Sequence, residues 1–221
     1  MGCTLHDSAV AAVLARLRAH ADAEDAPAKV HVQARERELG HKIYGRERVD
    51  AYGGAPLAIS EEVAKLVYVL AVARRPRTVV EFGASLGYST IHLAAALRDA
   101  GGGRLITTEL SADKAGTAAV NIAQAGLDDV VELRVGDALD TLASLDADVD
   151  FLFLDGSNDL YRGVLELLAP RLAPGALVVA DLSKGDPELE RYRAQMLDPG
   201  SGYVSVQVPL DDGVLISTPG A

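Results

Sequence analysis

The sequence contains one cysteine, no tryptophan, and aromatic residues at only 5% of its 221 positions. A single thiol, Cys3, can form neither an internal disulfide nor a zinc site built from several cysteines. The scarcity of aromatic side chains argues against a platform for stacking nucleic-acid bases. Basic residues are outnumbered by acidic ones, 21 to 32, and the resulting net charge of −11 repels phosphate backbones and anionic lipids. We therefore expect no nucleic-acid partner and no role at a membrane surface.

Long apolar runs are also missing. No uncharged apolar stretch reaches the length of about 18 residues at which a segment begins to span a bilayer. The start, MGCTLHDSAV, lacks the apolar stretch of a secretion signal, so we expect a cytoplasmic protein. Apolar residues make up 49% of the chain and charged residues 24%, which is enough to bury one full core. The length suits a single domain of ordinary to large size.

The first third of the chain has helical periodicity. Apolar residues recur at helical spacing over residues 10–17 and predict a helix that ends near Pro27, and a second, more polar helix follows over residues 28–39. Residues 41–56 are rich in glycine and proline and predict an irregular connection. Ser60 begins a strongly apolar helix that runs to about Arg74. We assign residues 1–56 to an N-terminal helical extension with a connection on the substrate side.

Residues 57–221 form the second predicted unit, in which short apolar runs alternate with helical stretches from Thr78 onward. This alternation is typical of βαβ units and a parallel sheet. The last two runs flank the turn LDDG and predict a hairpin, so the final strand must run antiparallel. We expect an α/β fold, a Rossmann-like doubly wound sheet that ends in an antiparallel hairpin. The predicted strands are Thr78–Phe82, Arg104–Thr108, Val130–Val135, Val149–Leu154, Ala176–Ala180, Tyr203–Val208 and Val214–Ser217, and the predicted helices are Ser89–Asp99, Asp113–Ala125, Leu139–Leu145, Leu160–Leu172 and Pro187–Leu197.

Three strand ends carry residues that suit an adenosine ligand. The first strand runs into EFGASLGYS, a glycine turn at the sheet edge where open α/β folds bind ligands. Gly83 and Gly87 permit positive φ or a close ligand approach, although they would also serve a tight strand-to-helix turn. Glu109 closes the second strand, where a carboxylate can accept hydrogen bonds from both ribose hydroxyls. After the third strand, Asp137 can hold an adenine amino group and Ala138 leaves room for the ring.

The loop chemistry separates two kinds of adenosine ligand. A dinucleotide site favours GxGxxG, whose backbone N–H groups face the pyrophosphate. Here Ser85 replaces the second of those glycines, and the carboxylate of Glu81 stands just before the turn. A carboxylate at that point would repel a pyrophosphate, but it suits a ligand that carries an ammonium and a sulfonium. The loop therefore favours a sulfonium methyl donor, and a nicotinamide-dependent oxidoreductase stays open as an alternative.

The segment VVEFGASLGYST resembles the class I S-adenosylmethionine-dependent methyltransferases, and within them the small O-methyltransferases similar to catechol and caffeoyl-CoA O-methyltransferases. The likeness covers about Leu57 to Ser217 and implies a sheet of seven strands, S-adenosylmethionine as cofactor, a small-molecule acceptor, and a homodimer paired through the N-terminal helices. It also implies donor-binding residues at the turn, at the methionine end, at the ribose and at the adenine. These are Glu81, Gly83, Ser85, Tyr88 and Ser89 for the turn, Ile59 and Ser60 for the methionine end, Glu109 and Leu110 for the ribose, Asp137 and Ala138 for the adenine, and Asp155 beside them.

Asp155 and Asp181 end the fourth and fifth predicted strands, so the family's strand order would place them at adjacent edges of the sheet. Two carboxylates beside a methyl donor can ligate Mg²⁺ or Ca²⁺, or can serve as bases that deprotonate an acceptor. They can also simply cap helices, because Asp is common at helix N-termini. We predict that both are catalytic.

The chain departs from the family at this point. Metal-dependent relatives have Asp-x-x-Lys after the fourth strand and Asp-Asn after the fifth, whereas this chain has Asn158 in the position of the lysine and Leu182 in that of the asparagine. An amide cannot take up a proton as an amine does, and leucine offers no oxygen to a cation. We therefore predict no metal-ligand set and a methyltransferase that works without the usual Mg²⁺-dependent mechanism. Transfer to carbon or nitrogen, and donor binding without turnover, remain alternatives.

Overall fold

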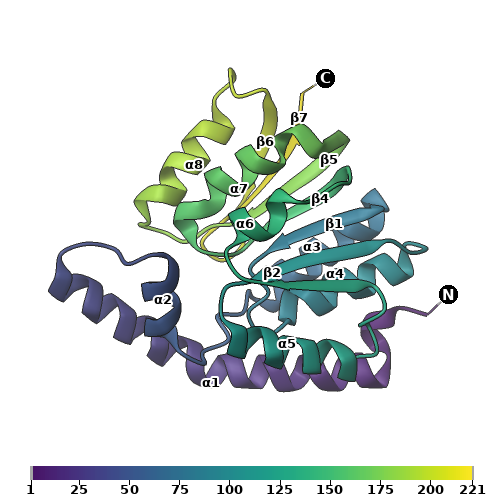
Figure 1. The fold of residues 1–221 in the computed structure, drawn as a ribbon, viewed down its shortest axis with the longest axis horizontal. Helices are drawn as coiled ribbons and strands as arrows, with labels where there is room; N and C mark the ends of the chain where they lie inside the picture. The colour runs from purple at the N-terminus through teal and green to yellow at the C-terminus, as the bar shows by residue number, and fades with distance from the viewer. Residues whose placement is uncertain (1, 221) are drawn as a thin grey trace.

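A seven-stranded sheet forms the centre of the molecule, in a computed structural model that describes residues 2–220 (Figure 1). The strand order is β3-β2-β1-β4-β5-β7-β6. Strand β7 pairs antiparallel with both β5 and β6, and the other pairs are parallel. The predicted doubly wound sheet with a C-terminal hairpin is confirmed. The strands are β1 Thr78–Phe82, β2 Arg104–Glu109, β3 Val131–Val135, β4 Val149–Leu154, β5 Leu172–Asp181, β6 Tyr203–Val208 and β7 Val214–Pro219.

Helices pack on both faces of this sheet. In β1, Val79 belongs to the core shared with α3, α4 and α5, whereas Val80 belongs to the core shared with α6, α7 and α8. This division follows from the period of two in a strand, which sends successive side chains to opposite faces. The helices are α3 Glu61–Arg74, α4 Tyr88–Asp99, α5 Ala112–Gln124, α6 Ala138–Ala143, α7 Tyr161–Leu168 and α8 Pro187–Leu197, with short 3₁₀ turns at Thr4–His6, Asn158–Leu160 and Ala169–Arg171.

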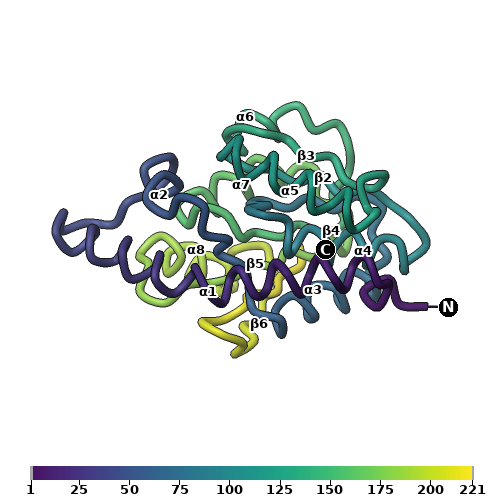
Figure 2. Tube along the Cα trace, turned by 90° about the horizontal axis from the view of Figure 1, so that it is seen from below, coloured from purple at the N-terminus to yellow at the C-terminus, as the bar shows by residue number. Residues whose placement is uncertain are grey.

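The N-terminal helix α1 (Ser8–Leu39) is continuous, so the predicted break at Pro27 is wrong. A proline inside a helix removes one hydrogen bond and crowds the preceding turn, at a cost of about 3 kcal/mol. Burial on both sides of Pro27 opposes that cost. Ala21 is buried before the proline, and Val32 is buried after it against Ile43. The second half of α1 therefore continues as a helix and extends past the sheet toward α2 (Figure 2).

The connection after α1 contains a helix, α2 (Gly45–Tyr52), where the sequence predicted irregular chain. The prediction failed because it took the glycines of this segment as signs of irregular chain. Gly45 and Gly53, with φ of +54° and +53°, instead mark the two ends of the helix. Tertiary contacts stabilise the segment. The carboxylate of Glu36 accepts hydrogen bonds from the Lys42 ammonium and from the Ile43 backbone N–H.

The boundary between α7 and β5 also differs from the prediction. The helix expected to reach Leu172 ends at Leu168, and β5 begins at Leu172 instead of Ala176. The pairing of β5 with β4 shifts register between Val149 and Phe151. An irregularity of this kind lets a strand accommodate proline and glycine, which here are Pro174 and Gly175. The prediction started the strand after these two residues, because proline and glycine usually interrupt a strand and the sequence does not reveal a register shift that accommodates them.

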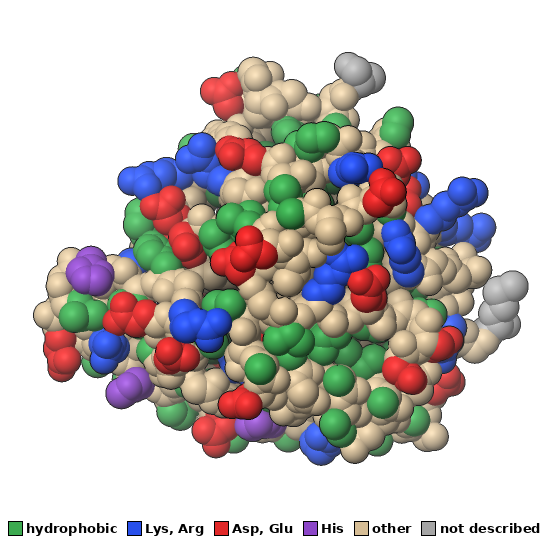
Figure 3. All heavy atoms as spheres, viewed as in Figure 1, with side chains coloured by type: hydrophobic (Ala, Val, Ile, Leu, Met, Phe, Trp, Pro, Cys, Tyr) green, Lys and Arg blue, Asp and Glu red, His purple; other side chains and the backbone are tan. Residues whose placement is uncertain are grey.

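Charge is mixed over the surface drawn in Figure 3, where acidic and basic side chains are interspersed across the face. Within residues 2–220, no helix combines the length and the apolar character needed to cross a bilayer.

Candidate functional site

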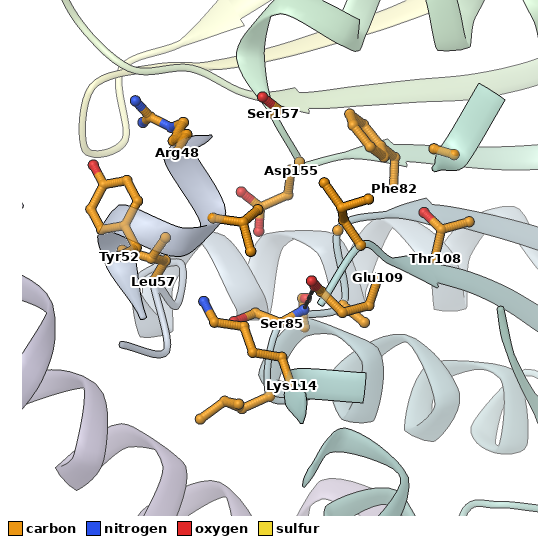
Figure 4. A pocket seen from close by; sticks show the side chains of 18 of the residues that line it. Arg48, Tyr52, Leu57, Phe82, Ser85, Thr108, Glu109, Lys114, Asp155 and Ser157 are labelled. Carbon is orange, nitrogen blue, oxygen red and sulfur yellow. Dashed lines mark hydrogen bonds between the residues drawn. The ribbon is translucent and has the colours of Figure 1, made fainter. Parts of the chain in front are cut away.

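A cavity of about 470 Å³ opens at the carboxyl ends of the central strands, beneath α2 (Figure 4). The strand order reverses between β1 and β4, and open α/β sheets bind ligands at such a point. Ten of the predicted site residues line the cavity, whereas Ser60, Glu81 and Asp181 are not among the lining residues. The ten are Ile59, Gly83, Ser85, Tyr88, Ser89, Glu109, Leu110, Asp137, Ala138 and Asp155.

The glycine turn is shaped by a close crossing of two chain segments. Gly83 has a φ of +102°, and a Cβ placed there would lie 2.5 Å from the backbone oxygen of Asp155. The backbone N–H groups of Gly83 and Ala84 donate to the carbonyl of Thr108 on β2, at 3.2 and 2.9 Å. Gly83 is therefore required by the packing of the loop after β4 against the turn, whatever ligand is bound. The turn is fixed before any ligand arrives.

Glu109 is held in a defined orientation at the end of β2. Its Oε2 accepts the Ser85 N–H at 2.9 Å and its Oε1 accepts the Ser111 N–H at 2.8 Å. The residue is only 8% exposed, yet it lines the cavity. A carboxylate has about four acceptor positions, so each oxygen can still accept a hydrogen bond from a ligand hydroxyl. This geometry suits a vicinal diol.

Glu81 lies behind the turn and is fully buried. Its Oε2 accepts hydrogen bonds from the hydroxyls of Thr90 and Thr107, both at 2.6 Å, whereas its Oε1 has no hydrogen-bond partner among residues 2–220. Burial raises the pKa of this carboxyl above its usual range. Ser60 is also set back, because its hydroxyl accepts the Val63 N–H and caps α3. The structure thus gives Glu81 and Ser60 positions that support the cavity wall, and their predicted ligand contacts stay predictions.

The carboxyl of Asp155 projects into the cavity from the end of β4 (Figure 4). Burial raises the pKa of Asp155, and the neighbouring carboxylate of Asp181 raises it further. Burial, followed by the negative charge of Asp211, raises the pKa of Asp181 to about 7. The two predicted catalytic carboxyls are therefore neighbours that influence each other's protonation. A carboxyl with a raised pKa is a better base than an exposed aspartate.

The residues around this pair do not fit the metal site of the metal-dependent relatives. Leu182 is buried and contributes no side-chain oxygen. The Asn158 amide donates instead to Asp186, at 2.9 Å, near the N-terminus of α8. In the part of the chain from Gly2 to Gly220, no group of three or more His, Cys, Asp and Glu side chains is arranged to hold a metal ion.

Sequence reasoning missed the wall of the cavity formed by α2. Arg46, Arg48, Val49 and Tyr52 all line it. The guanidinium of Arg48 lies 5.0 Å from the centre of the Tyr52 ring and 3.5 Å from the carboxylate of Glu36. These contacts join residues brought together by the fold of α1 and α2. The signal in the sequence was the place of this segment, which precedes α3 and which we assigned to the substrate side.

Residues 55–59, which we call the strap, form another wall that the sequence only partly revealed. The Lys114 ammonium donates to the Ala55 carbonyl at 2.7 Å, and the Ser85 hydroxyl donates to the Pro56 carbonyl. The backbone N–H groups of Leu57 and Ala58 donate to the carboxylate of Asp25 on α1, at 2.7 and 3.0 Å. Leu57 has a φ of +51°, a conformation that persists only where its surroundings fix it. The strap is fixed by α1, α5 and the glycine turn together.

Comparisons with known proteins agree with this architecture. A family model described as a methyltransferase domain matches residues 80–181. The chain is 35% identical over 136 residues to a catechol O-methyltransferase of Niastella koreensis, a match that covers 59% of this chain and 61% of that protein. The chain thus spans about three fifths of this relative's length. It is 32% identical over 130 residues to a catechol O-methyltransferase of Sus scrofa, covering 56% of this chain and 69% of that protein.

A solved structure is similar over most of the chain. It is that of the O-methyltransferase TomG from Streptomyces achromogenes, involved in tomaymycin synthesis, in complex with S-adenosylmethionine. The two chains are 28% identical, the TM-score is 0.66, and the match covers 88% of this chain and 89% of the other.

Proposed function

The chain belongs to the class I S-adenosylmethionine-dependent O-methyltransferases, and from that premise we propose that it transfers a methyl group from S-adenosylmethionine to an oxygen of a small-molecule acceptor. The observation that carries the proposal is that the carboxylates of Glu109, whose fixed geometry suits a diol, and of Asp155, whose pKa is raised by burial, line one cavity. The first suits the nucleoside of the donor. The second suits the hydroxyl of the acceptor.

The donor half of the cavity is built for an adenosine with a charged tail. Glu109 would accept hydrogen bonds from the ribose hydroxyls, Asp137 from the adenine amino group, and the segment from Gly83 to Ser89 would surround the methionine end. When bound, S-adenosylmethionine supplies a methyl group on a sulfonium, and its transfer forms an oxygen–carbon bond and leaves S-adenosylhomocysteine. The protein's contribution to such a displacement is chiefly to hold the acceptor oxygen about 3 to 3.5 Å from the methyl carbon.

The proton of the acceptor needs a base. We assign that role to Asp155, which lines the cavity and whose pKa is raised by burial and by Asp181. In its ionised form Asp155 takes the proton as the acceptor oxygen bonds to the methyl carbon, and the pKa raised by burial and by the neighbouring Asp181 favours the protonated carboxyl that results. No step requires a metal, which agrees with Leu182 in place of a side-chain oxygen ligand.

A second candidate is a protein that binds the donor without turnover. It is favoured by Asn158, which stands where metal-dependent relatives carry the lysine base, and by Leu182. The nicotinamide alternative has no support in the family that matches. Transfer to nitrogen or carbon uses the same donor geometry and is distinguished by the product.

A second copy of this chain is the proposed protein partner. Val30 and Leu39, on the outer half of α1, are 62% and 44% exposed. Pairing of two such halves through the side of the helix that carries Val30 would cover that apolar side chain, whereas Leu39 points to the opposite side of the helix. Light scattering of the purified chain tests this directly: a monomer mass at micromolar concentration would contradict it.

The enzymatic proposal is tested with isotopically labelled S-adenosylmethionine and a panel of phenols, catechols, indoles and amines. We expect methylated oxygen in the product, turnover unaffected by EDTA, and a kcat reduced by 10²- to 10⁴-fold in Asp155→Asn. The matched control is Asp146→Asn, whose side chain is 95% exposed. Turnover lost in EDTA and restored by Mg²⁺ would overturn the metal-free assignment. Donor binding without any product across the panel would favour the second candidate.

A further inference from the structure

Lys114 is a buried lysine that faces the donor half of the cavity. It lies in the first turn of α5, is 7% exposed and lines the cavity. Its ammonium donates one hydrogen bond within the structure, to the Ala55 carbonyl of the strap at 2.7 Å. An ammonium has three donors, and burying a charge is costly unless its donors find partners. Two N–H groups of Lys114 are therefore free for a ligand, as far as residues 2–220 show.

The carboxylate of Glu109 is a charged neighbour of this ammonium. Burial lowers the pKa of Lys114, and the carboxylates of Glu109 and Asp25 oppose that shift. Figure 4 shows the Lys114 and Glu109 side chains entering the cavity with Ser85 between them. Because the Ser85 and Ser111 N–H groups fix the carboxylate of Glu109, its free acceptor positions face the cavity. A fixed acceptor and a donor group with free N–H groups thus lie at the same end of the cavity.

We propose that Lys114 is a donor-binding residue that holds the ribose of S-adenosylmethionine together with Glu109. This inference rests on the proposed function. A ribose hydroxyl both donates and accepts a hydrogen bond. One hydroxyl donates to the Glu109 carboxylate, and the oxygen of a ribose hydroxyl accepts from the Lys114 ammonium. The ribose is then recognised by groups of opposite charge. Since Lys114 also holds the Ala55 carbonyl, the same ammonium joins the bound ribose to the strap.

A purely structural role for Lys114, in which it only anchors the strap, makes a different prediction. Loss of such an anchor would weaken the binding of every donor analogue by the same factor. Loss of a ribose contact instead weakens only those ligands that carry the hydroxyl in question. The two roles are separated by removing the lysine and the hydroxyls in turn, which is a double-mutant cycle between protein and ligand.

The experiment measures binding of S-adenosylhomocysteine and of its 2′-deoxy and 3′-deoxy analogues by calorimetry. In the wild-type chain we expect each deoxy analogue to bind at least 10-fold more weakly than S-adenosylhomocysteine, because a hydrogen bond to a charged group is lost. In Lys114→Met we expect S-adenosylhomocysteine to bind at least 10-fold more weakly, and the discrimination against one of the two analogues to fall to within about 2-fold. Lys65→Met is the matched control, since Lys65 is 62% exposed and pairs with Glu61 on the same helix.

Two results would overturn the proposal. One is an equal weakening of all three ligands by Lys114→Met, which would leave the lysine a structural role only. The other is equally tight binding of all three ligands by the wild-type chain, a measurement that does not depend on any variant folding. If the wild-type chain binds none of the three ligands, the proposed function itself fails, and that outcome is distinct from both.

Discussion

The two halves of the cavity are built in different ways. The donor half comes from three consecutive strand ends, and backbone hydrogen bonds from Gly83 and Ala84 to Thr108 fix its turn to the sheet. The half that we propose for the acceptor is lined by α2, which side chains such as Glu36 hold in place through Arg48. A site fixed by the sheet backbone tolerates little change. A site fixed by side chains on loops and short helices can vary while the sheet stays intact. We expect donor binding to be the common property of this fold and acceptor choice to be particular to this chain.

The largest expected effect is at the crossing beneath the donor half. Gly83→Ala would place a Cβ 2.5 Å from the Asp155 backbone oxygen at a φ of +102°. We expect the free energy of unfolding to fall by more than about 3 kcal/mol, because backbone on both sides must move. Gly101→Ala is the control, with a φ of +103° and no atom within 4 Å of the new Cβ, and should cost only about 1–2 kcal/mol. Urea denaturation measures both. If both variants lose the same free energy of unfolding, the cost at Gly83 comes from its positive φ alone and not from the close approach of Asp155.

Removal of the diol acceptor should be the next largest effect. Glu109→Ala deletes the carboxylate that accepts the Ser85 and Ser111 N–H groups. We expect binding of S-adenosylhomocysteine to weaken by about 1–3 kcal/mol, the range for hydrogen bonds to a charged group. The control is Glu132→Ala on β3, whose side chain is 49% exposed beside Arg134. If Glu109→Ala binds S-adenosylhomocysteine as tightly as wild type, Glu109 does not contact the ligand, and the distinction drawn between the two halves of the cavity is wrong.

The same contrast explains how far the sequence could be interpreted. That Gly83, Glu109 and Asp137 line one cavity was predictable, because each follows a short apolar run and parallel strands bring their carboxyl ends to one edge of the sheet. The wall formed by α2 was not predicted, because this helix packs through Tyr52 against Val32 and Ile43, which lie outside it, in a small core of their own. Local rules also failed at Pro27, where burial on both sides outweighs the cost of a proline inside a helix.

At neutral and higher pH, the buried carboxyl of Asp181, next to Asp155, should lower the free energy of unfolding. Since the pKa of Asp181 is raised to about 7, the folded chain binds a proton there more tightly than the unfolded chain does. Its contribution to stability is thus complete below about pH 4 and is lost as the pH rises through about 7. We expect Asp181→Asn to be more stable than wild type by about 1–2 kcal/mol at pH 8, a difference that disappears near pH 4.

Thermal unfolding at a series of pH values measures this effect. Asp148→Asn is the matched control, because it makes the same substitution at an exposed aspartate just ahead of β4. A variant that is less stable than wild type at pH 8 would mean that Asp181 is held by favourable contacts, and the assignment of a raised pKa to this carboxyl would be wrong.

The smallest effect is expected on the acceptor side, at Tyr44 ahead of α2. Its hydroxyl lies 3.4 and 3.5 Å from the carboxylate oxygens of Asp186, and burial raises the pKa of the phenol to about 12, so it remains a donor at neutral pH. Asp186 is already bound by the Asn158 amide and by the N–H groups at the start of α8. Tyr44→Phe should therefore lower stability by at most about 0.5 kcal/mol.

In the same variant, the N–H of Gly45 still donates to the Ser157 hydroxyl at 3.2 Å and retains the second link between α2 and the sheet edge. We expect the affinity for S-adenosylhomocysteine to be unchanged and the KM for the acceptor to rise by no more than about 2- to 3-fold, the equivalent of that energy. Calorimetry and initial rates measure the two quantities separately. A loss of donor affinity in Tyr44→Phe comparable to that in Glu109→Ala would mean that α2 and the nucleoside site respond as one unit, because the Tyr44 hydroxyl bonds to Asp186 at the start of α8 and not, among residues 2–220, to the donor half.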